Sequence, residues 1–222
     1  MEKVEVLRQY FGFSSFREGQ QTLIDAVLAG RDVLGVMPTG GGKSLCYELP
    51  ALLLPGLTLV ISPLISLMKD QVMALQNAGI PAGCIHSAMS VEELREAYRD
   101  TRFGAYKILY IAPERLLTDG FCALAQELEI SLLAVDEAHC ISQWGQDFRP
   151  SYLKILDFLQ KLPRRPALAA FTATATAQVR SDIVRILQLQ DPVTVVTGFD
   201  RPNLRFEVLR PQDLLKDMAL TP

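Results

Sequence analysis

A glycine-rich segment that ends in lysine and serine restricts the possible folds of this chain more than any other feature. The segment consists of Met37, Pro38, Thr39, Gly40, Gly41, Gly42, Lys43 and Ser44. It follows the apolar run 32–36 and precedes a helical pattern that begins at Leu45. Glycines let backbone N–H groups surround phosphate oxygens, and the helix adds the positive end of its dipole. The segment therefore predicts a phosphate-binding loop, with Lys43 reaching the outer phosphates and Ser44 ligating Mg²⁺.

One position departs from the usual form of such a loop, because Met37 stands where the pattern begins with glycine. The alternative is a chance glycine-rich turn that caps a helix. We favour the phosphate-binding loop, since Gly-Lys-Ser also falls at a strand-to-helix junction.

Short apolar runs alternate with helical patterns along the rest of the chain. The expected strands are 32–36, 58–61, 82–85, 108–111, 132–135, 168–171 and 193–196. The expected helices are 4–11, 20–28, 65–76, 91–101, 121–127, 152–160 and 177–187. This alternation predicts an α/β fold with a mostly parallel sheet and helices on both faces. Ligands of such folds bind at the carboxyl ends of the strands.

Two carboxylates directly follow the strand expected at 132–135. Asp136 can hold Mg²⁺, and Glu137 can orient or deprotonate the attacking water in phosphoryl transfer. The alternative is a pair of acidic residues that cap the next helix. His139 is either a packing residue or a relay between this site and neighbouring segments. Thr172 and Thr174, after the strand at 168–171, offer two hydroxyl groups near the expected phosphates.

An aromatic, a cation and an amide precede the phosphate-binding loop in the sequence. Phe13 can stack on a base, and the amide of Gln20 can pair with the edge of adenine. Arg17 lies between them. The alternative, a core phenylalanine with two surface polar residues, is equally compatible with the sequence.

The segment 141–150 fits neither helical nor strand periodicity and contains the only tryptophan of the chain. Gln143, Trp144, Phe148 and Arg149 could stack on and clamp single-stranded bases. The alternative for Trp144 is a core anchor. Two further segments, 62–71 and 112–115, begin at strand ends and could hold nucleic-acid phosphates, with Ser62 and Lys69 as contacts in the first.

The formal charge of −3 and the pI near 5.5 exclude a protein coated in basic charge. They allow a local nucleic-acid groove with weak, salt-sensitive binding. The four cysteines are scattered, which indicates neither a disulfide framework nor a zinc site. We find no signal peptide and no membrane-spanning run, so we expect a soluble, cytoplasmic protein, associated with the nucleoid if it is bacterial.

These segments, in this order, resemble the first motor lobe of superfamily 2 helicases, and within that group the RecQ family of DNA helicases. The matching segments are 16–20, 39–44, 62–71, 112–115, 136–139, 141–150 and 172–174. The segment 141–150 is similar to the aromatic-rich loop by which that family senses single-stranded DNA. The loss of the first loop glycine is also common in superfamily 2.

The resemblance implies a RecA-like P-loop NTPase fold, ATP and Mg²⁺ as cofactors, and 3′-to-5′ unwinding of DNA in recombination and repair. It implies catalytic roles for Lys43, Asp136, Glu137 and His139, and Mg²⁺ ligation by Ser44 and Asp136. Adenine recognition falls to Phe13, Arg17 and Gln20, and DNA sensing to Trp144, Phe148 and Arg149.

The resemblance also divides the chain into an adenine-recognition segment at 1–30, a RecA-like lobe at 31–197 and an inter-lobe linker at 198–222. The second lobe of the family has no counterpart, so we expect a fragment that lacks unwinding activity alone. Its expected partners are that second lobe and DNA, both single-stranded and at duplex junctions, without a membrane. The alternatives are the motor lobe of an RNA helicase and a non-catalytic nucleotide-binding module.

Overall fold

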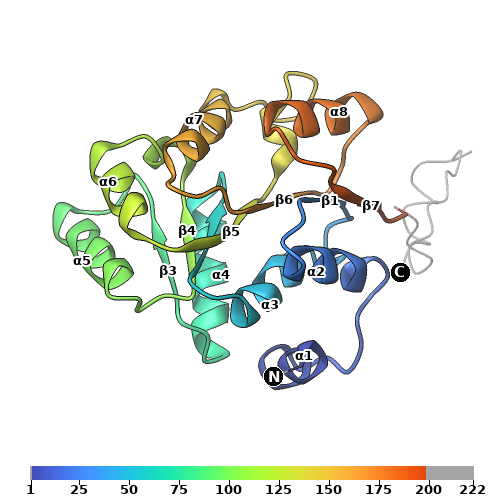
Figure 1. Ribbon diagram of the computed structural model, residues 1–222, viewed down its shortest axis with the longest axis horizontal. Helices are drawn as coiled ribbons and strands as arrows, with labels where there is room; N and C mark the ends of the chain where they lie inside the picture. Colours follow the sequence, from blue (N-terminus) through green and yellow to red (C-terminus); the bar gives the residue numbers. More distant parts are fainter. Residues whose placement is uncertain (1, 199–222) are drawn as a thin grey trace, which may run out of the picture.

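The computed structural model describes residues 2–198 of the chain, in which seven parallel strands form one sheet (Figure 1). The strands are β1 (Val33–Val36), β2 (Leu57–Ile61), β3 (Ala82–Ile85), β4 (Ile108–Ile111), β5 (Ile130–Val135), β6 (Ala167–Thr172) and β7 (Val193–Val196). Their order across the sheet is β3-β4-β2-β5-β6-β1-β7. The predicted α/β fold with a parallel sheet is confirmed.

Helices cover both faces of the sheet (Figure 1). One layer contains α2 (Gln20–Leu28), α3 (Leu45–Leu53) and α4 (Ile65–Asn77), with α1 (Lys3–Phe11) packed on its outside. The other layer contains α5 (Val91–Arg102), α6 (Asp119–Glu127), α7 (Lys154–Lys161) and α8 (Ala177–Ile186).

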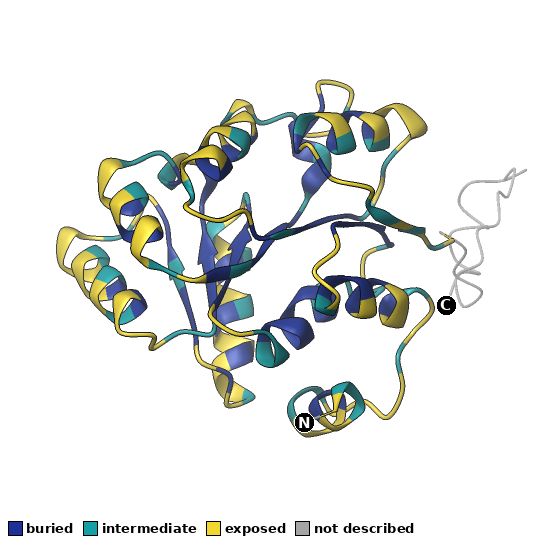
Figure 2. Ribbon diagram, viewed as in Figure 1, coloured by how far each residue is buried: buried dark blue, intermediate teal, exposed yellow. Residues whose placement is uncertain are grey.

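Side chains that alternate along each strand divide the apolar core into these two layers. In β2, Leu59 and Ile61 pack toward α5–α8, whereas Val60 packs toward α2–α4. The strands other than β7 are therefore largely buried on both faces, as the dark ribbon at the centre of Figure 2 shows, whereas β7 at the edge of the sheet is partly exposed. Continuous apolar runs rather than alternating ones are typical of such strands.

Local sequence signals fix the ends of several helices. Ser90 caps α5 by accepting a hydrogen bond from the N–H of Glu93, whose side chain accepts one from the N–H of Ser90. Thr176 caps α8 through the N–H of Val179. Short 3₁₀ helices at Pro113–Arg115, Ala138–Ile141 and Pro150–Leu153 were not predicted, and the last of them delays the start of α7 to Lys154.

Three neighbouring strands bring the predicted site segments to one edge of the sheet. β6 lies between β1 and β5, with Val36 paired to Thr172 and Val135 paired to Ala170. The glycine-rich loop after β1, the Asp-Glu pair after β5 and the threonines after β6 therefore leave the sheet side by side. A shared ligand site at this edge is what the topology of parallel sheets favours.

An ion pair between buried Asp32 and partly exposed Arg165 lies at the opposite end of the same strands. Asp32 is 2% exposed and accepts two hydrogen bonds from the guanidinium of Arg165, at 2.6 and 3.1 Å. Its carboxylate also accepts from the backbone N–H groups of Leu168 and Gln190. The beginnings of β1 and β6 are thereby joined, which fixes the strands that carry the site.

Among residues 2–198, no helix has both the length and the apolar character that crossing a membrane requires. Of the four free cysteines, Cys46 and Cys140 are buried in the core. Cys84 and Cys122 are half-buried. The linker predicted at 198–222 lies outside the described residues, except for its first position.

Candidate functional site

A cavity of about 470 Å³ opens at the carboxyl ends of β1 and β5. Its lining includes Phe13, Arg17, Gln20, Thr39, Gly40, Gly42, Lys43, Ser44, Glu48, Asp136 and Glu137. The structure thus brings together the glycine-rich loop, the Asp-Glu pair and the aromatic-cation-amide group that precedes α2. Gln71 and Leu67 of α4 close another side of the cavity.

The glycines of the loop adopt a conformation that other residues rarely reach. Gly40 and Gly42 both have φ of 79°. A Cβ on Gly42 would lie 2.3 Å from Nε2 of Gln20, and one on Gly41 would lie 2.8 Å from the carbonyl oxygen of Pro38. The loop therefore requires glycine both for its backbone angles and for its close packing.

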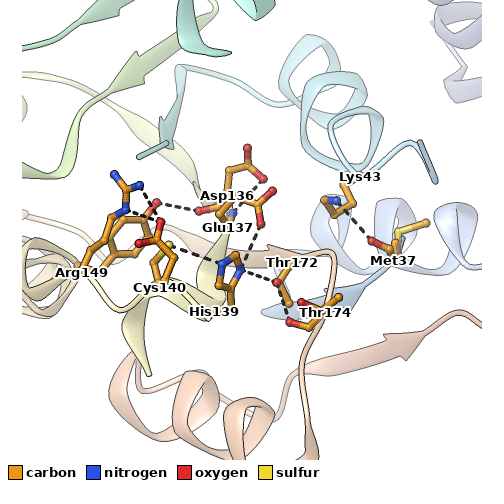
Figure 3. Close-up of polar contacts among 11 residues, drawn as sticks. Met37, Lys43, Asp136, Glu137, His139, Cys140, Arg149, Thr172 and Thr174 are labelled. Atoms are coloured by element: carbon orange, nitrogen blue, oxygen red, sulfur yellow. Dashed lines mark hydrogen bonds and ion pairs between the residues drawn. The ribbon is translucent and has the colours of Figure 1, made fainter. Parts of the chain in front are cut away.

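Met37 explains why this loop does not begin with glycine. Its side chain is 1% exposed and belongs to the core layer under α2 and α3. Its N–H donates to the carbonyl oxygen of Thr172 at 3.0 Å, and its carbonyl oxygen accepts from Nζ of Lys43 at 3.4 Å (Figure 3). The position thus anchors the loop to β6 while the turn itself begins later.

The segment before α2 is bonded directly to the loop. Nε2 of Gln20 donates to the carbonyl oxygen of Gly42 at 3.1 Å, and its Oε1 accepts from the N–H of Arg17 at 2.8 Å. The guanidinium of Arg17 donates to the carbonyl oxygen of Gly40. Phe13 is 49% exposed, whereas Gln20 is buried. The alternative with a core phenylalanine and a surface glutamine is therefore wrong.

The two carboxylates after β5 have different environments. Asp136 is 8% exposed, and burial together with the charge of Glu137 raises its pKa to about 6. The N–H of Glu137 donates to Oδ1 of Asp136 at 3.0 Å (Figure 3). Glu137 has φ of 47°, a strained conformation for a non-glycine residue that occurs preferentially at functional sites.

His139 connects the Asp-Glu pair to the end of β6. Its Nδ1 lies 2.9 Å from Oγ1 of Thr172 and 3.2 Å from Oε2 of Glu137 (Figure 3). The contact with His139 lowers the pKa of Glu137, while contacts with Cys140 and Glu137 raise the pKa of His139. Oγ1 of Thr172 also donates to the carbonyl oxygen of Thr174 at 3.1 Å.

The two threonines after β6 differ in their exposure. Thr172 is fully buried against His139, and Thr174 is exposed. Neither belongs to the cavity lining found among residues 2–198. The structure joins Thr172 to the Asp-Glu pair through His139, and a direct contact of either threonine with a ligand stays a prediction.

Sequence reasoning missed Glu48, a buried acid of the cavity wall. Its carboxylate is 6% exposed and accepts a hydrogen bond from the hydroxyl of Tyr110 at 3.1 Å. Burial raises its pKa to about 7. An acidic residue in the first turn of a helix is usually exposed to solvent and interacts favourably with the helix dipole. This position in the pattern therefore gave no reason to expect that Glu48 is buried. The apolar residues on both sides of it are the signal of burial.

The aromatic loop, residues 141–150, lies beside this site and presents its tryptophan to solvent. Trp144 is 75% exposed, so the core-anchor alternative is wrong. The guanidinium of Arg149 donates to Oδ2 of Asp147 at 2.7 and 2.9 Å and to the carbonyl oxygen of Pro63 at 2.9 Å. The hydroxyl of Tyr152 donates to the carbonyl oxygen of Asp136 at 3.0 Å. Arg149 thus joins the loop to the segment after β2, and Tyr152, just beyond the loop, contacts the residue after β5.

The other predicted DNA contacts are dispersed. Gln143 is exposed within the aromatic loop, and Phe148 is half-buried. Lys69 is exposed on α4 and faces His86 and Cys84 rather than the cavity. Ser62 is 1% exposed, and its hydroxyl is one of few buried polar groups without a hydrogen-bond partner in the part of the chain that is described. A direct contact of that hydroxyl with DNA would need movement of the surrounding chain.

Parallel strands, a glycine-rich loop and an Asp-Glu pair at one sheet edge define a RecA-like nucleotide-binding domain. The chain belongs to the DEAD/DEAH box helicase family, whose profile matches residues 17–183. The crystal structure of a hypothetical ATP-dependent RNA helicase from Sulfolobus tokodaii is similar, with a TM-score of 0.66 and 22% identity. The matched region covers 87% of this chain and 56% of the Sulfolobus chain. At this identity the likeness concerns the fold alone.

Curated relatives of this chain are named as RecQ helicases, the family that the sequence motifs resemble. The chain is 50% identical over 206 residues to the ATP-dependent DNA helicase RecQ of Bacillus subtilis (strain 168), which covers 92% of this chain. It is 48% identical to the protein of that name from Pasteurella multocida (strain Pm70), which covers 93% of it. The chain spans about a third of these relatives' lengths, 35% and 32%. The predicted resemblance to RecQ helicases is confirmed.

Proposed function

We propose that the chain is the ATP-binding motor lobe of an ATP-dependent DNA helicase that unwinds duplex DNA in the 3′-to-5′ direction during recombination and repair. One observation carries this proposal. Lys43 and Ser44 face Asp136 and Glu137 across one cavity, at the ends of strands that the sheet brings close together. Cation, hydroxyl and carboxylates in this arrangement are what phosphoryl transfer from a nucleoside triphosphate requires.

The nucleotide would lie with its phosphates on the loop 39–44 and its base toward Phe13, Arg17 and Gln20. Phe13 is exposed at the mouth of the cavity and offers a face for stacking. The amide of Gln20 is already bonded to Arg17 and Gly42, so base recognition by this residue requires an exchange of those bonds. Such an exchange would connect base binding to the geometry of the phosphate loop.

The oxygen atoms of Ser44 and Asp136 suit Mg²⁺, which prefers hydroxyl, carboxylate and water ligands. The donor set fits the ion in a second respect. Asp136 is buried with its pKa raised to about 6, so a neighbouring cation would stabilise its charged form. Bound Mg²⁺ would neutralise charge on the β- and γ-phosphates.

Glu137 is the proposed water-orienting base of the hydrolysis. Its carboxylate lies 3.2 Å from Nδ1 of His139, which keeps its pKa low and its side chain oriented. His139 in turn contacts Thr172 at the end of β6. This chain of contacts offers a route by which events at the phosphates reach neighbouring segments.

Single-stranded DNA is the proposed partner of the aromatic loop. Trp144 supplies an exposed ring, and Phe148 and Arg149 lie a few residues beyond it. Base stacking on aromatic side chains tolerates any sequence, as a helicase needs. DNA at duplex junctions and a second RecA-like lobe are the further proposed partners, and such an enzyme acts inside the cell. We retain the division into an adenine segment at 1–30, a lobe at 31–197 and a linker at 198–222 as part of this proposal.

The alternatives are an RNA helicase lobe and a non-catalytic nucleotide-binding module. They are separated by the rate of ATP hydrolysis in a protein that joins this chain to its second lobe, measured with single-stranded DNA and with single-stranded RNA of equal length. We expect stimulation by DNA and little by RNA. Stronger stimulation by RNA would support the RNA helicase, and the absence of hydrolysis with either would support the non-catalytic module.

A further inference from the structure

The aromatic loop is exposed at its tip but fastened to helix α8 at its base. Oγ of Ser142 donates a hydrogen bond to Oδ2 of Asp182 at 2.7 Å. The same Oγ accepts one from the backbone N–H of Trp144 at 3.1 Å. Ser142 is fully buried and Asp182 is 6% exposed. A continuous pair of hydrogen bonds therefore leads from α8 to the backbone of the exposed tryptophan.

The two oxygens of Asp182 have different partners. Oδ2 accepts from Ser142, whereas Oδ1 accepts from Arg185 at 2.9 Å and from Gln178 at 3.4 Å. Arg185 and Gln178 belong to the same helix as Asp182. The contacts within α8 orient the carboxylate so that its other oxygen, Oδ2, accepts from Ser142 of the loop.

At its base the loop packs against α8, where Ile141 shares the apolar core with Val179 and Ile183. Toward the tip of the loop, a cavity of about 320 Å³ is lined by both segments, with Trp144, Phe148, Leu153, Asp182 and Ile186 among its lining residues. Beyond Ile141, the hydrogen bond between Ser142 and Asp182 therefore joins the loop to the helix.

The turn that carries Trp144 also lies against the backbone of His139. A Cβ on Gly145 would lie 2.2 Å from the carbonyl oxygen of His139 and 3.1 Å from that of Ser142. The N–H of Gly145 donates to the carbonyl oxygen of Ser142 at 2.9 Å. The position of the turn is thus tied to the residue whose ring contacts Glu137 and Thr172.

We infer that Asp182 is a positioning residue that holds the aromatic loop, and Trp144 with it, in a fixed place beside the Asp-Glu pair. The inference rests on the proposed function in one respect, since it assigns the support of the proposed DNA-sensing loop to α8. Asp182 touches neither nucleotide nor DNA in this account. It acts through Ser142, and loss of either partner releases the turn.

The test uses the only tryptophan of the chain as its probe. Trp144 fluorescence anisotropy reports the freedom of the loop, and chymotrypsin cleavage after Trp144 and Phe148 reports its opening. In Asp182→Ala and in Ser142→Ala we expect lower anisotropy and cleavage about tenfold faster or more, because a hydrogen bond to a charged acceptor is lost. Cleavage after Phe103, which is 79% exposed and directly follows α5, is the internal reference.

Two further variants separate positioning from a general loss of structure. Arg185→Ala removes a partner of Oδ1 but leaves the bond to Ser142, so it should match the wild-type chain in both readouts. Asp182→Asn retains an acceptor for the Ser142 hydroxyl and should restore most of the anisotropy lost in Asp182→Ala. Circular dichroism shows whether each variant is folded.

Two results would overturn the inference, provided that Ser142→Ala and Asp182→Asn are folded. In the first, the anisotropy and the cleavage rate of both variants stay at wild-type values. In the second, both quantities change equally in the two variants. Affinity for a non-hydrolysable ATP analogue, measured on the same wild-type chain, reports on the proposed function separately. If the wild-type chain binds no nucleotide but the variants show lower anisotropy and faster cleavage, the proposed function is refuted and the role of Asp182 stands.

Discussion

Replacing Glu137 by glutamine is expected to lower the rate of ATP hydrolysis by about 10² to 10⁴, because the amide cannot accept a proton from the attacking water. Nucleotide affinity should stay within about twofold of the wild-type value, since Lys43, Ser44 and Asp136 remain in place. The substitution preserves the size of the side chain and an oxygen that can accept from Nδ1 of His139, 3.2 Å away in the wild-type chain.

The rate is best measured in a protein that contains both motor lobes, with single-stranded DNA present and with binding followed separately by titration. Glu92→Gln, at the exposed start of α5, is the matched control and should leave the rate unchanged. An equal loss of affinity and hydrolysis in Glu137→Gln would contradict the role of water-orienting base. A rate that does not change would contradict it as well.

The second large effect is the dependence of hydrolysis on a second lobe. The cations that line the cavity, among the residues that the structure describes, are Lys43 and Arg17, and Arg17 is bonded to the carbonyl oxygen of Gly40. Another cation for the γ-phosphate must therefore come from elsewhere. In related enzymes an arginine supplied in this way is worth about 10³ to 10⁵ in rate.

We accordingly expect residues 1–222 alone to bind nucleotide, to hydrolyse ATP about 10³-fold or more slowly than a two-lobed protein, and to unwind no DNA. Steady-state hydrolysis of both proteins, with and without single-stranded DNA, measures the ratio. An arginine substitution in the added lobe should return the two-lobed protein toward the rate of the chain alone. Rapid, DNA-stimulated turnover by residues 1–222 alone would refute this expectation.

The sheet and the place of the site could be predicted from the sequence because both depend on local patterns. Apolar runs such as 58–61 and 108–111 each became a strand with little change in their bounds. Parallel topology then places the segments after β1, β5 and β6 at one edge. The proximity of the phosphate loop to the Asp-Glu pair follows from this arrangement alone.

Contacts between distant segments could not be predicted in the same way. The bonds of Gln20 to the phosphate loop depend on the path of the turn before α2, which no periodicity encodes. Asp182 lies 40 positions after Ser142, and its place in α8 is that of an ordinary polar helix residue. The burial of Glu48 could not be predicted because an acidic residue near the start of a helix is usually exposed to solvent.

The aromatic loop shows a third limit. Its sequence could encode either a core anchor or an exposed sensor, since a lone tryptophan suits both. The outcome depends on Gly145, which lets the turn fold against the carbonyl oxygen of His139 and leaves the indole outside. The contact of Gly145 with His139 is a tertiary contact, and the presence of a glycine in the sequence does not reveal it.

Titration of a non-hydrolysable ATP analogue with Mg²⁺ into residues 1–222 tests the central claim most directly. The wild-type chain should bind with 1:1 stoichiometry, and Lys43→Ala should lower the affinity about tenfold to a hundredfold through the loss of charge-assisted hydrogen bonds to the phosphates. Lys161→Ala, at the exposed end of α7, is the matched control and should bind as the wild type does. Equal affinities of Lys43→Ala and the wild-type chain, or no binding by either, would contradict the account.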